Sequence, residues 1–137
     1  MSDAMYDKPL PAIDVESGPF WQAARDHRVA IMRCRACSRH FFYPRELCPH
    51  CHSAATEWVT ASGRGTIYTF TIARRPAGPA FKADVPYVVA LVELEEGPRL
   101  MTNIVTRDVE GVRVGQSVKA VFEQVTADVT LVKFAPT

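Results

Sequence analysis

The sequence predicts a mainly β protein in which a short N-terminal helix and a zinc ribbon precede a five-stranded barrel. Three observations support this fold class. Two Cys-x-x-Cys pairs lie ten residues apart in the first half of the chain, a spacing typical of a zinc ribbon. From residue 66 onward, apolar and polar residues alternate with period two, as in half-buried strands. Before both of these, Ser17-Gly18-Pro19 is typical of a helix start.

One structural Zn²⁺ is predicted at Cys34, Cys37, Cys48 and Cys51. Each pair can form a tight turn that points both sulfurs to one side, and four thiolates suit tetrahedral Zn²⁺. The link between the pairs is shorter than the usual spacing of about 15–20 residues, but two such pairs in one short segment remain a specific signal. Because four sulfurs complete the metal's coordination sphere, we expect a structural rather than a catalytic zinc.

The residues around the pairs carry two further expectations. Ser38 and His52 follow the pairs at positions where glycine most easily accepts positive φ, so each should store a little backbone strain. His50 and His52 could bind zinc through imidazole, but with four thiolates available we expect both outside the first coordination shell.

Three other roles for the cysteines fit less well. Disulfides need an oxidising compartment, whereas the first residues show no basic stretch followed by a long apolar run. Thioredoxin-type redox chemistry uses one Cys-x-x-Cys at a helix start within a βαβ pattern. Cys48-Pro49-His50-Cys51-His52 also matches the c-type haem attachment signature, but that role would leave Cys34 and Cys37 unexplained.

The chain divides into three predicted segments. Residues 1–16 contain Pro9 and Pro11 among scattered charges, which predicts a flexible arm. A helix and the zinc ribbon are expected at 17–61, and the barrel at 62–137. Within the ribbon, strands are expected at 29–32 and 57–59, and Ser62-Gly63-Arg64-Gly65 has the composition of a hinge.

The predicted helix carries two large aromatic residues. Ser17 is expected to cap it, with Pro19 in its first turn. Phe20, Trp21 and Ala24 then share one face. A helix this short is marginal in water, so the aromatic residues must pack either within their own domain or on a partner protein. We take Phe20 and Trp21 as candidate partner-binding residues.

Five strands are expected in the barrel. The second is apolar on both faces and should be central, and Glu95-Glu96-Gly97-Pro98 supplies the turn that follows it. Five short antiparallel strands favour a barrel of the OB type over a sandwich. The expected strands are 66–73, 87–94, 100–105, 118–125 and 129–134.

The long connection at 74–86 is a candidate ligand site. It carries three cations, Arg74, Arg75 and Lys82, together with Phe81. The cations could contact phosphates, and Phe81 could lie against a ring. An ordinary solvated loop is the alternative.

Charge and hydropathy exclude some classes of function. With 16 basic and 15 acidic residues the net charge is +1, which argues against a protein that coats a polyanion. From residue 62 onward there are nine basic and eight acidic residues, whereas a barrel that follows a phosphate backbone should be more basic. No stretch approaches the roughly 20 apolar residues that span a bilayer, so we expect a cytoplasmic protein without a membrane partner.

Several motifs, in this order, resemble one known family. They are Pro19-Phe20-Trp21, the two cysteine pairs with Phe41-Phe42-Tyr43-Pro44-Arg45 between them, Gly63-x-Gly65-Thr66-Ile67-Tyr68 and Val85-Pro86-Tyr87. The chain is similar from about residue 19 to residue 134 to the zinc-ribbon plus OB-fold family long carried as a domain of unknown function. The resemblance implies a rubredoxin-like ribbon followed by an OB-fold barrel. The glycine often found in that family after each cysteine pair is absent here.

The resemblance also implies a function in acyl-CoA metabolism. Members of this family look like accessory proteins of thiolase-fold enzymes: thiolases, hydroxymethylglutaryl-CoA synthases and lipid-transfer-protein-like thiolases or aldolases. In that family the helix and ribbon help to dock the partner, and the barrel has been linked to acyl-CoA binding. The resemblance therefore predicts a hetero-oligomer with such an enzyme, with a CoA thioester as a possible ligand. Its phosphates would then contact Arg74, Arg75 and Lys82, and its adenine would lie against Phe81.

A non-catalytic role agrees with the residues themselves. The sequence offers no Ser/His/Asp set, no spare cysteine and no paired carboxylates in a recognisable motif. The alternative function is a zinc-ribbon and OB-fold module that binds single-stranded nucleic acid. Only fold analogy supports that alternative.

Overall fold

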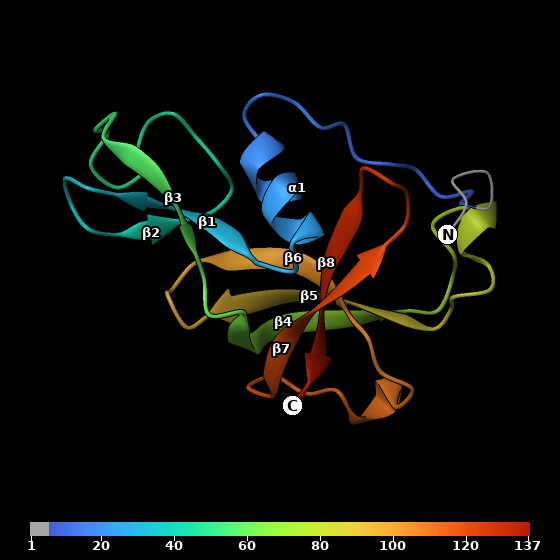
Figure 1. The fold of residues 1–137 in the computed structure, drawn as a ribbon. Coiled ribbons are helices and arrows are strands. Elements are labelled where there is room, and N and C mark those ends of the chain that lie inside the picture. Colours follow the sequence, from blue (N-terminus) through green and yellow to red (C-terminus); the bar gives the residue numbers. More distant parts are fainter. Residues whose placement is uncertain (1–5) are drawn as a thin grey trace.

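The computed structural model describes residues 6–137, and residues 1–5 of the predicted arm lie outside the described part. One helix, a three-stranded sheet and a five-stranded barrel follow one another along the chain (Figure 1). Two short 3₁₀ turns, η2 and η3, lie in barrel connections. The elements are α1 (Gly18–Arg25), β1 (Ala30–Cys34), β2 (His40–Phe41), β3 (Thr56–Thr60), β4 (Arg64–Ala73), η2 (Pro79–Phe81), β5 (Tyr87–Leu94), β6 (Arg99–Ile104), η3 (Val109–Gly111), β7 (Ser117–Gln124) and β8 (Thr130–Pro136).

Helix α1 forms where the sequence predicts it, but its N-terminus is built differently. Pro19 lies in the first turn as expected. The prediction that the Ser17 side chain caps the helix is wrong, because Ser17 itself has a helical backbone and makes no capping bond. Its N–H donates to Asp14 Oδ1 over 2.7 Å and its hydroxyl accepts from the Asp14 N–H over 3.3 Å. The two side chains close a turn ahead of the helix instead.

The ribbon is an antiparallel sheet in the order β2-β1-β3. Strands β1 and β3 lie at the predicted places. Strand β2 was not predicted, because two residues are too short to show a period-two pattern. It pairs Phe41 with Met32 and His40 with Arg33, and so holds the loop between the cysteine pairs against β1.

The barrel confirms the five predicted strands and corrects one pairing. The strands close in the order β4-β5-β6-β8-β7, with β5 between β4 and β6. Four of the five neighbouring pairs are antiparallel, as expected. The fifth, between β6 and β8, is parallel and is recorded at Ile104 and Phe134. Strand directions cannot alternate all the way around a ring with an odd number of strands, so one parallel pair is unavoidable.

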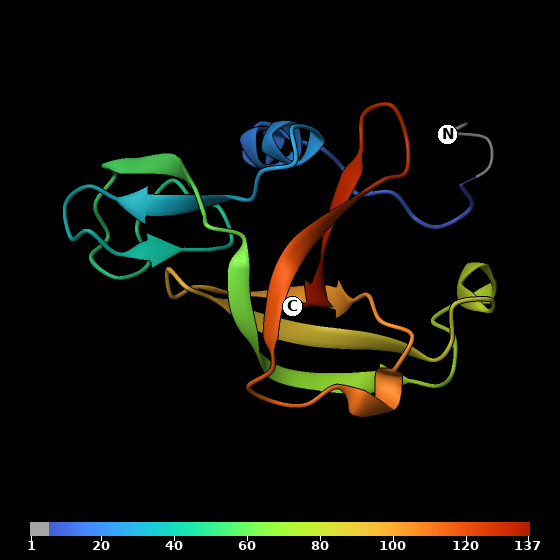
Figure 2. The ribbon, with the colours of Figure 1, turned by 60° about the horizontal axis from the view of Figure 1, so that its bottom comes forward.

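The ribbon and the barrel share one core. Val29 and Ile31, from the start of the ribbon, are fully or almost fully buried in the same cluster as Val92, Val118 and Phe134 of the barrel. Burying these apolar side chains together stabilises both parts. Helix α1 packs against β1 and β8, and in both views it lies between the ribbon and the β7–β8 hairpin (Figures 1 and 2).

The segment predicted as a hinge is built into the sheet. Arg64 and Gly65 already belong to β4 and pair with Lys119 and Val118 of β7. At Gly65 a Cβ atom would collide with the Glu93 carbonyl oxygen, so the close approach of β5 requires glycine here. The division of the chain at residues 61 and 62 remains a prediction.

Candidate metal centre and adjoining groove

Two matching turns hold the cysteines. The first follows β1, where the Ser38 N–H donates to the Cys34 carbonyl oxygen over 2.8 Å, and in the second the His52 N–H donates to the Cys48 carbonyl oxygen over 2.8 Å. Ser38 and His52 have φ of 67° and 66°, as the sequence predicted. Positive φ at these residues turns the chain away after each pair and leaves the sulfurs facing inward.

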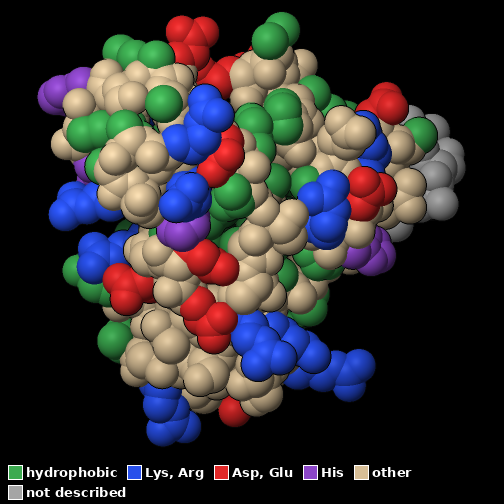
Figure 3. All heavy atoms as spheres, turned by 60° about the vertical axis from the view of Figure 1, so that its left-hand side comes forward, with side chains coloured by type: hydrophobic (Ala, Val, Ile, Leu, Met, Phe, Trp, Pro, Cys, Tyr) green, Lys and Arg blue, Asp and Glu red, His purple; other side chains and the backbone are tan. Residues whose placement is uncertain are grey.

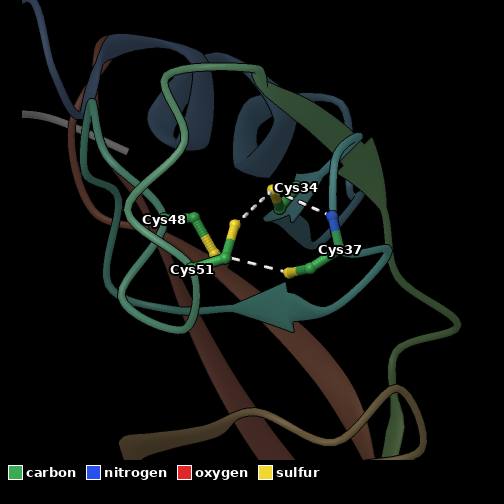
Figure 4. A group of neighbouring side chains, drawn as sticks. All are labelled: Cys34, Cys37, Cys48 and Cys51. Atoms are coloured by element: carbon green, nitrogen blue, oxygen red, sulfur yellow. Dashed lines mark hydrogen bonds between the residues drawn. The ribbon is translucent and has the colours of Figure 1, made fainter.

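The four sulfurs converge on one point (Figure 4). All four Sγ atoms lie within 4.8 Å of one another, with 3.6 Å between Cys34 and Cys51 and 3.7 Å between Cys37 and Cys48. Four sulfurs bound to one tetrahedral zinc at its usual bond length lie about 3.8 Å apart. The cluster therefore fits one structural Zn²⁺, and within residues 6–137 it is the one group of three or more potential metal ligands.

Backbone donors favour the thiolate form that a metal requires. The Cys37 N–H donates to Cys34 Sγ over 3.4 Å, and the His50 N–H donates to Cys48 Sγ over 3.3 Å. The bond from Cys37 is the main cause that lowers the pKa of Cys34 to about 7. A thiolate stabilised in this way binds zinc with less competition from protons.

Neither histidine joins the cluster. His50 Nδ1 lies 3.3 Å from Nη1 of Arg39 instead, and His52 is exposed. The expectation that both lie outside the four-sulfur set agrees with this arrangement. The zinc centre is also tied to the ribbon core, because Cys34 and Cys48 pack with Met32, Phe41 and the half-buried Trp58.

The two aromatic residues of α1 lie over the junction of ribbon and barrel. The ring centroids of Phe20 and Trp21 are 5.0 Å apart, and Phe20 lies 5.4 Å from Phe42. Both are half-buried. They therefore pack partly within their own domain and leave part of their surface accessible.

A hollow of about 320 Å³ opens between α1, residues 42–44, β6 and β8. We call it the apolar groove, and its main apolar lining is Phe20, Trp21, Tyr43, Leu100, Met101 and Leu131. The Tyr43 hydroxyl accepts the Met101 N–H over 2.9 Å, which fixes the ribbon loop to the edge of β6. Sequence reasoning missed Tyr43 and Met101 as site residues, because only folding brings two positions 58 residues apart into contact.

The predicted ligand residues on the connection 74–86 are not brought together as one site. Arg74 Nη2 pairs with Glu110 Oε1 at 2.5 Å, and Arg75 and Lys82 are exposed. Phe81 lines a second cavity of about 300 Å³, which we call the polar pocket, together with Lys8, Asp84, Tyr87, Glu123 and Lys133 among other residues.

Charged side chains in the polar pocket are paired. Lys8 Nζ lies 3.1 Å from Asp84 Oδ2 and 5.6 Å from the centre of the Phe81 ring. The hydrogen bond to Asp84 raises the pKa of Lys8, so the ammonium stays charged. Lys133 Nζ pairs with Glu123 Oε1 at 2.5 Å. The described end of the arm therefore contacts the same pocket as Phe81.

Elsewhere the surface mixes both signs of charge. On the face in Figure 3, Lys and Arg side chains are interspersed with Asp and Glu. Ion pairs such as Arg33 with Glu57 and Arg99 with Glu93 neutralise part of the basic charge. Within residues 6–137, no helix has both the length and the apolar character needed to cross a membrane.

Comparison with known families gives two matches that follow each other along the chain. A model described as the ChsH2 rubredoxin-like zinc ribbon domain matches residues 21–57. A model described as the ChsH2 C-terminal OB-fold domain matches residues 58–123. The chain is also 36% identical over 110 residues to a DUF35 domain-containing scaffold protein of Methanocaldococcus jannaschii, which covers 79% of this chain and 77% of that protein.

Two further relatives are named for enzymes. The chain is 39% identical over 129 residues to a probable enoyl-CoA hydratase alpha subunit of Thermomonospora curvata, but although the match covers 94% of this chain it spans only 40% of that protein. Among solved structures, a chain of an Ltp2-ChsH2(DUF35) aldolase superposes with a TM-score of 0.82 at 38% identity, covering 93% of this chain and 98% of that chain.

Proposed function

Because the chain belongs to the family of DUF35 domain-containing scaffold proteins, we propose that it is a non-catalytic accessory subunit that binds a thiolase-fold enzyme and helps to hold its acyl-CoA substrate. One solved structure that shares its fold is described as an Ltp2-ChsH2(DUF35) aldolase. The relative in Thermomonospora curvata is named for an enzyme that acts on a CoA thioester. The aldolase supports the class of partner proposed, and the hydratase name supports a CoA thioester as the substrate.

The observation that carries this proposal is the aromatic surface of α1. Phe20 and Trp21 are large, half-buried and next to the exposed Tyr43 and Met101. Aromatic side chains on a rigid support are the residues that most often dominate association. The zinc-bound ribbon and the shared core supply such a support with little ordering cost.

A non-catalytic role fits the described chemistry. Within residues 6–137, the cysteine cluster is the one metal-type group, and four thiolates leave no open position on zinc for a substrate or water. The zinc would then hold the two turns together and contribute folding energy. The reaction itself would belong to the partner enzyme.

Purification of the full chain from its native cells tests the proposal. An affinity tag at the C-terminus keeps α1 free, and size exclusion followed by mass spectrometry identifies the companion. We expect a thiolase-fold enzyme in near-stoichiometric amount. A chain that elutes alone, or with an unrelated enzyme, would contradict the proposed function.

The nucleic-acid alternative predicts a different result. Binding that depends on phosphates weakens steeply with salt, so an oligonucleotide column at moderate salt separates the two functions. The paired charges around the barrel, such as Arg74 with Glu110 and Lys133 with Glu123, favour passage through that column. Retention of the chain would support the alternative.

A further inference from the structure

The polar pocket holds a lysine of the N-terminal arm in a setting that suits an ammonium group. Lys8 Nζ lies 3.1 Å from Asp84 Oδ2, 5.6 Å from the centre of the Phe81 ring and 5.8 Å from the centre of the Tyr6 ring. Proteins bind cations with a carboxylate and with aromatic rings within about 6 Å. Lys8 therefore occupies a site with the chemistry of an amine-binding pocket.

The barrel domain supplies most of this site without the arm. Phe81 ends η2 and Tyr87 begins β5, and their ring centroids lie 6.1 Å apart. The Asp84 N–H donates to the Phe81 carbonyl oxygen over 3.0 Å, which fixes the carboxylate next to the rings. All three side chains line the pocket. The site would therefore persist if the arm moved away.

The charges of the pocket balance only while Lys8 is present. Four charged side chains line it, two cations and two carboxylates: Lys8, Lys133, Asp84 and Glu123. Lys133 pairs with Glu123, and Lys8 pairs with Asp84. Of the four, Lys8 alone comes from the arm. Its withdrawal leaves two carboxylates and one cation, so the open pocket attracts another cation.

The arm is held loosely beyond this contact. Residues 6–16 run from α1 toward η2 (Figure 1). Among the residues that the structure describes, no hydrogen bond or ion pair joins residues 9–13 to the rest of the protein. The side chains of Lys8 and Asp84 are themselves 26% and 44% exposed, and ion pairs in contact with water contribute little stability. Lys8 can therefore leave the pocket at low cost.

We infer that the polar pocket binds a primary ammonium group on an alkyl chain, and that Lys8 is an internal ligand which such a group displaces. Two sources supply this chemistry, a lysine side chain in an extended segment of another protein and a small alkylamine. The cavity of about 300 Å³ is large enough for either alkyl chain. This function goes beyond the binding of a thiolase-fold enzyme and does not depend on it.

The tether makes Lys8 an effective competitor. A group joined to its site by a short flexible segment has an effective concentration on the order of millimolar. An incoming amine binds only those molecules whose arm has lifted, and its apparent affinity falls by that fraction. Removal of the Lys8 ammonium should therefore strengthen the binding of an external amine.

Two probes test the inference on the full, zinc-loaded chain. They are n-butylammonium and an acetylated peptide amide with the sequence of residues 6–10, Tyr-Asp-Lys-Pro-Leu. Lys8→Met keeps an unbranched apolar side chain but removes the charge. We expect Lys8→Met to bind at least one probe tenfold or more tightly than wild type does. NMR titration of the labelled proteins measures Kd, and n-butanol and a norleucine version of the peptide are the neutral controls.

Two further variants locate the effect. Lys119→Met is the matched control, because it removes one exposed cation from β7 outside the pocket, and it should bind both probes as wild type does. Asp84→Asn in the Lys8→Met background keeps the size of the side chain but removes the carboxylate. We expect this double variant to lose the tenfold gain. Thermal melts and zinc content establish that all the variants fold.

The pattern of binding decides the outcome. Tighter binding of the peptide alone supports a lysine in an extended segment as the ligand, and tighter binding of n-butylammonium, with or without the peptide, supports a small amine. If neither probe binds Lys8→Met more tightly than wild type, or if Asp84→Asn leaves the gain intact, the inference is wrong and Lys8 only fastens the arm. Equal binding of the lysine and norleucine peptides would also overturn it. The proposed function stands in each case.

Discussion

Single residues at the metal centre act through the backbone as well as through sulfur. Ser38 and His52 accept positive φ, and the amide donors of Cys37 and His50 point at the sulfurs. The positive φ of Ser38 and His52 follows from the geometry of the two turns. The hydrogen bonds that the N–H groups of Cys37 and His50 donate to sulfur follow from the same geometry. Sulfur position and thiolate stability are therefore set together by the same two turns.

Replacement of a buried ligand should release the metal. Cys48→Ser removes a fully buried thiolate and leaves three sulfurs, so we expect loss of zinc and unfolding of the ribbon. His50→Ala is the matched control, because it changes the same turn outside the four-sulfur set. Metal analysis of both purified proteins checks this expectation. A variant at Cys48 that keeps one zinc per chain would show that the ligand set is wrong.

The close approach at Gly65 gives a second prediction at this scale. Gly65→Ala places a Cβ against the Glu93 carbonyl oxygen and Val92, and the backbone of β5 must move. We expect the free energy of unfolding to fall by about 2 kcal/mol or more. Gly78→Ala is the control, because nothing lies within 4 Å of a Cβ there. Urea denaturation of the two variants measures the difference, and equal stabilities would contradict the close approach.

Among the elements, α1 and the connection 74–86 carry the functional predictions. The helix is only eight residues long, so its position depends on packing against β1 and β8 rather than on helix propensity. The connection is instead held by contacts of its side chains, Arg74 with Glu110 and Asp84 with Lys8. Helix α1 is thus held in place by apolar burial, whereas the connection 74–86 is held by ion pairs near the surface.

A substitution in the helix separates docking from internal packing. If Trp21 serves mainly its own domain, Trp21→Ala should lower the free energy of unfolding by about 3–5 kcal/mol. Since its ring is only half-buried, we expect a smaller loss together with failure to co-purify with the partner. Tyr68→Ala is the control for removal of an exposed aromatic ring away from the groove. A strongly destabilised Trp21 variant that still assembles would refute the interface.

Removal of cations from the connection tests their part in CoA binding. Arg74→Ala with Arg75→Ala removes two charges that could contact phosphates, each worth about 1.5–3 kcal/mol when a contact is well formed. We expect the affinity for a CoA thioester to fall at least tenfold in the assembled complex. The control is the double variant Arg113→Ala with Lys119→Ala, which removes two positive charges elsewhere on the barrel. Equal affinities of the two double variants would make residues 74–86 an ordinary solvated loop.

In the whole molecule, the shared core couples the zinc ribbon to the barrel. Val29 and Ile31 lie at the start of the ribbon, but their side chains pack among barrel residues. Structural zinc can contribute on the order of 10–16 kcal/mol to the folding of a small ribbon. Loss of the metal should therefore affect both parts, although all four ligands lie in one of them.

Chelation of zinc measures this coupling. We expect the ribbon to unfold and the barrel to keep its strands but to melt at a lower temperature, because Val29 and Ile31 no longer cover its core. Far-UV circular dichroism follows the barrel, and fluorescence of Trp58 in β3 follows the ribbon in a Trp21→Phe background. A barrel with an unchanged Tm after chelation would show that the two parts fold independently.

Sequence alone determined the features that depend on local chemistry. The spacing of the cysteines predicts the metal cluster, because a turn of four residues is enough to orient each pair of sulfurs. The positive φ of Ser38 and His52 follows from the same turns, and the barrel strands follow from the alternation of residues.

Tertiary structure alone decided where distant segments meet. Closure of an odd number of strands makes β6 and β8 parallel. The contacts of Tyr43 with Met101, of Arg74 with Glu110 and of Lys8 with Phe81 join positions far apart in the chain. No local pattern encodes such contacts, because a side chain's partner depends on how the whole chain packs.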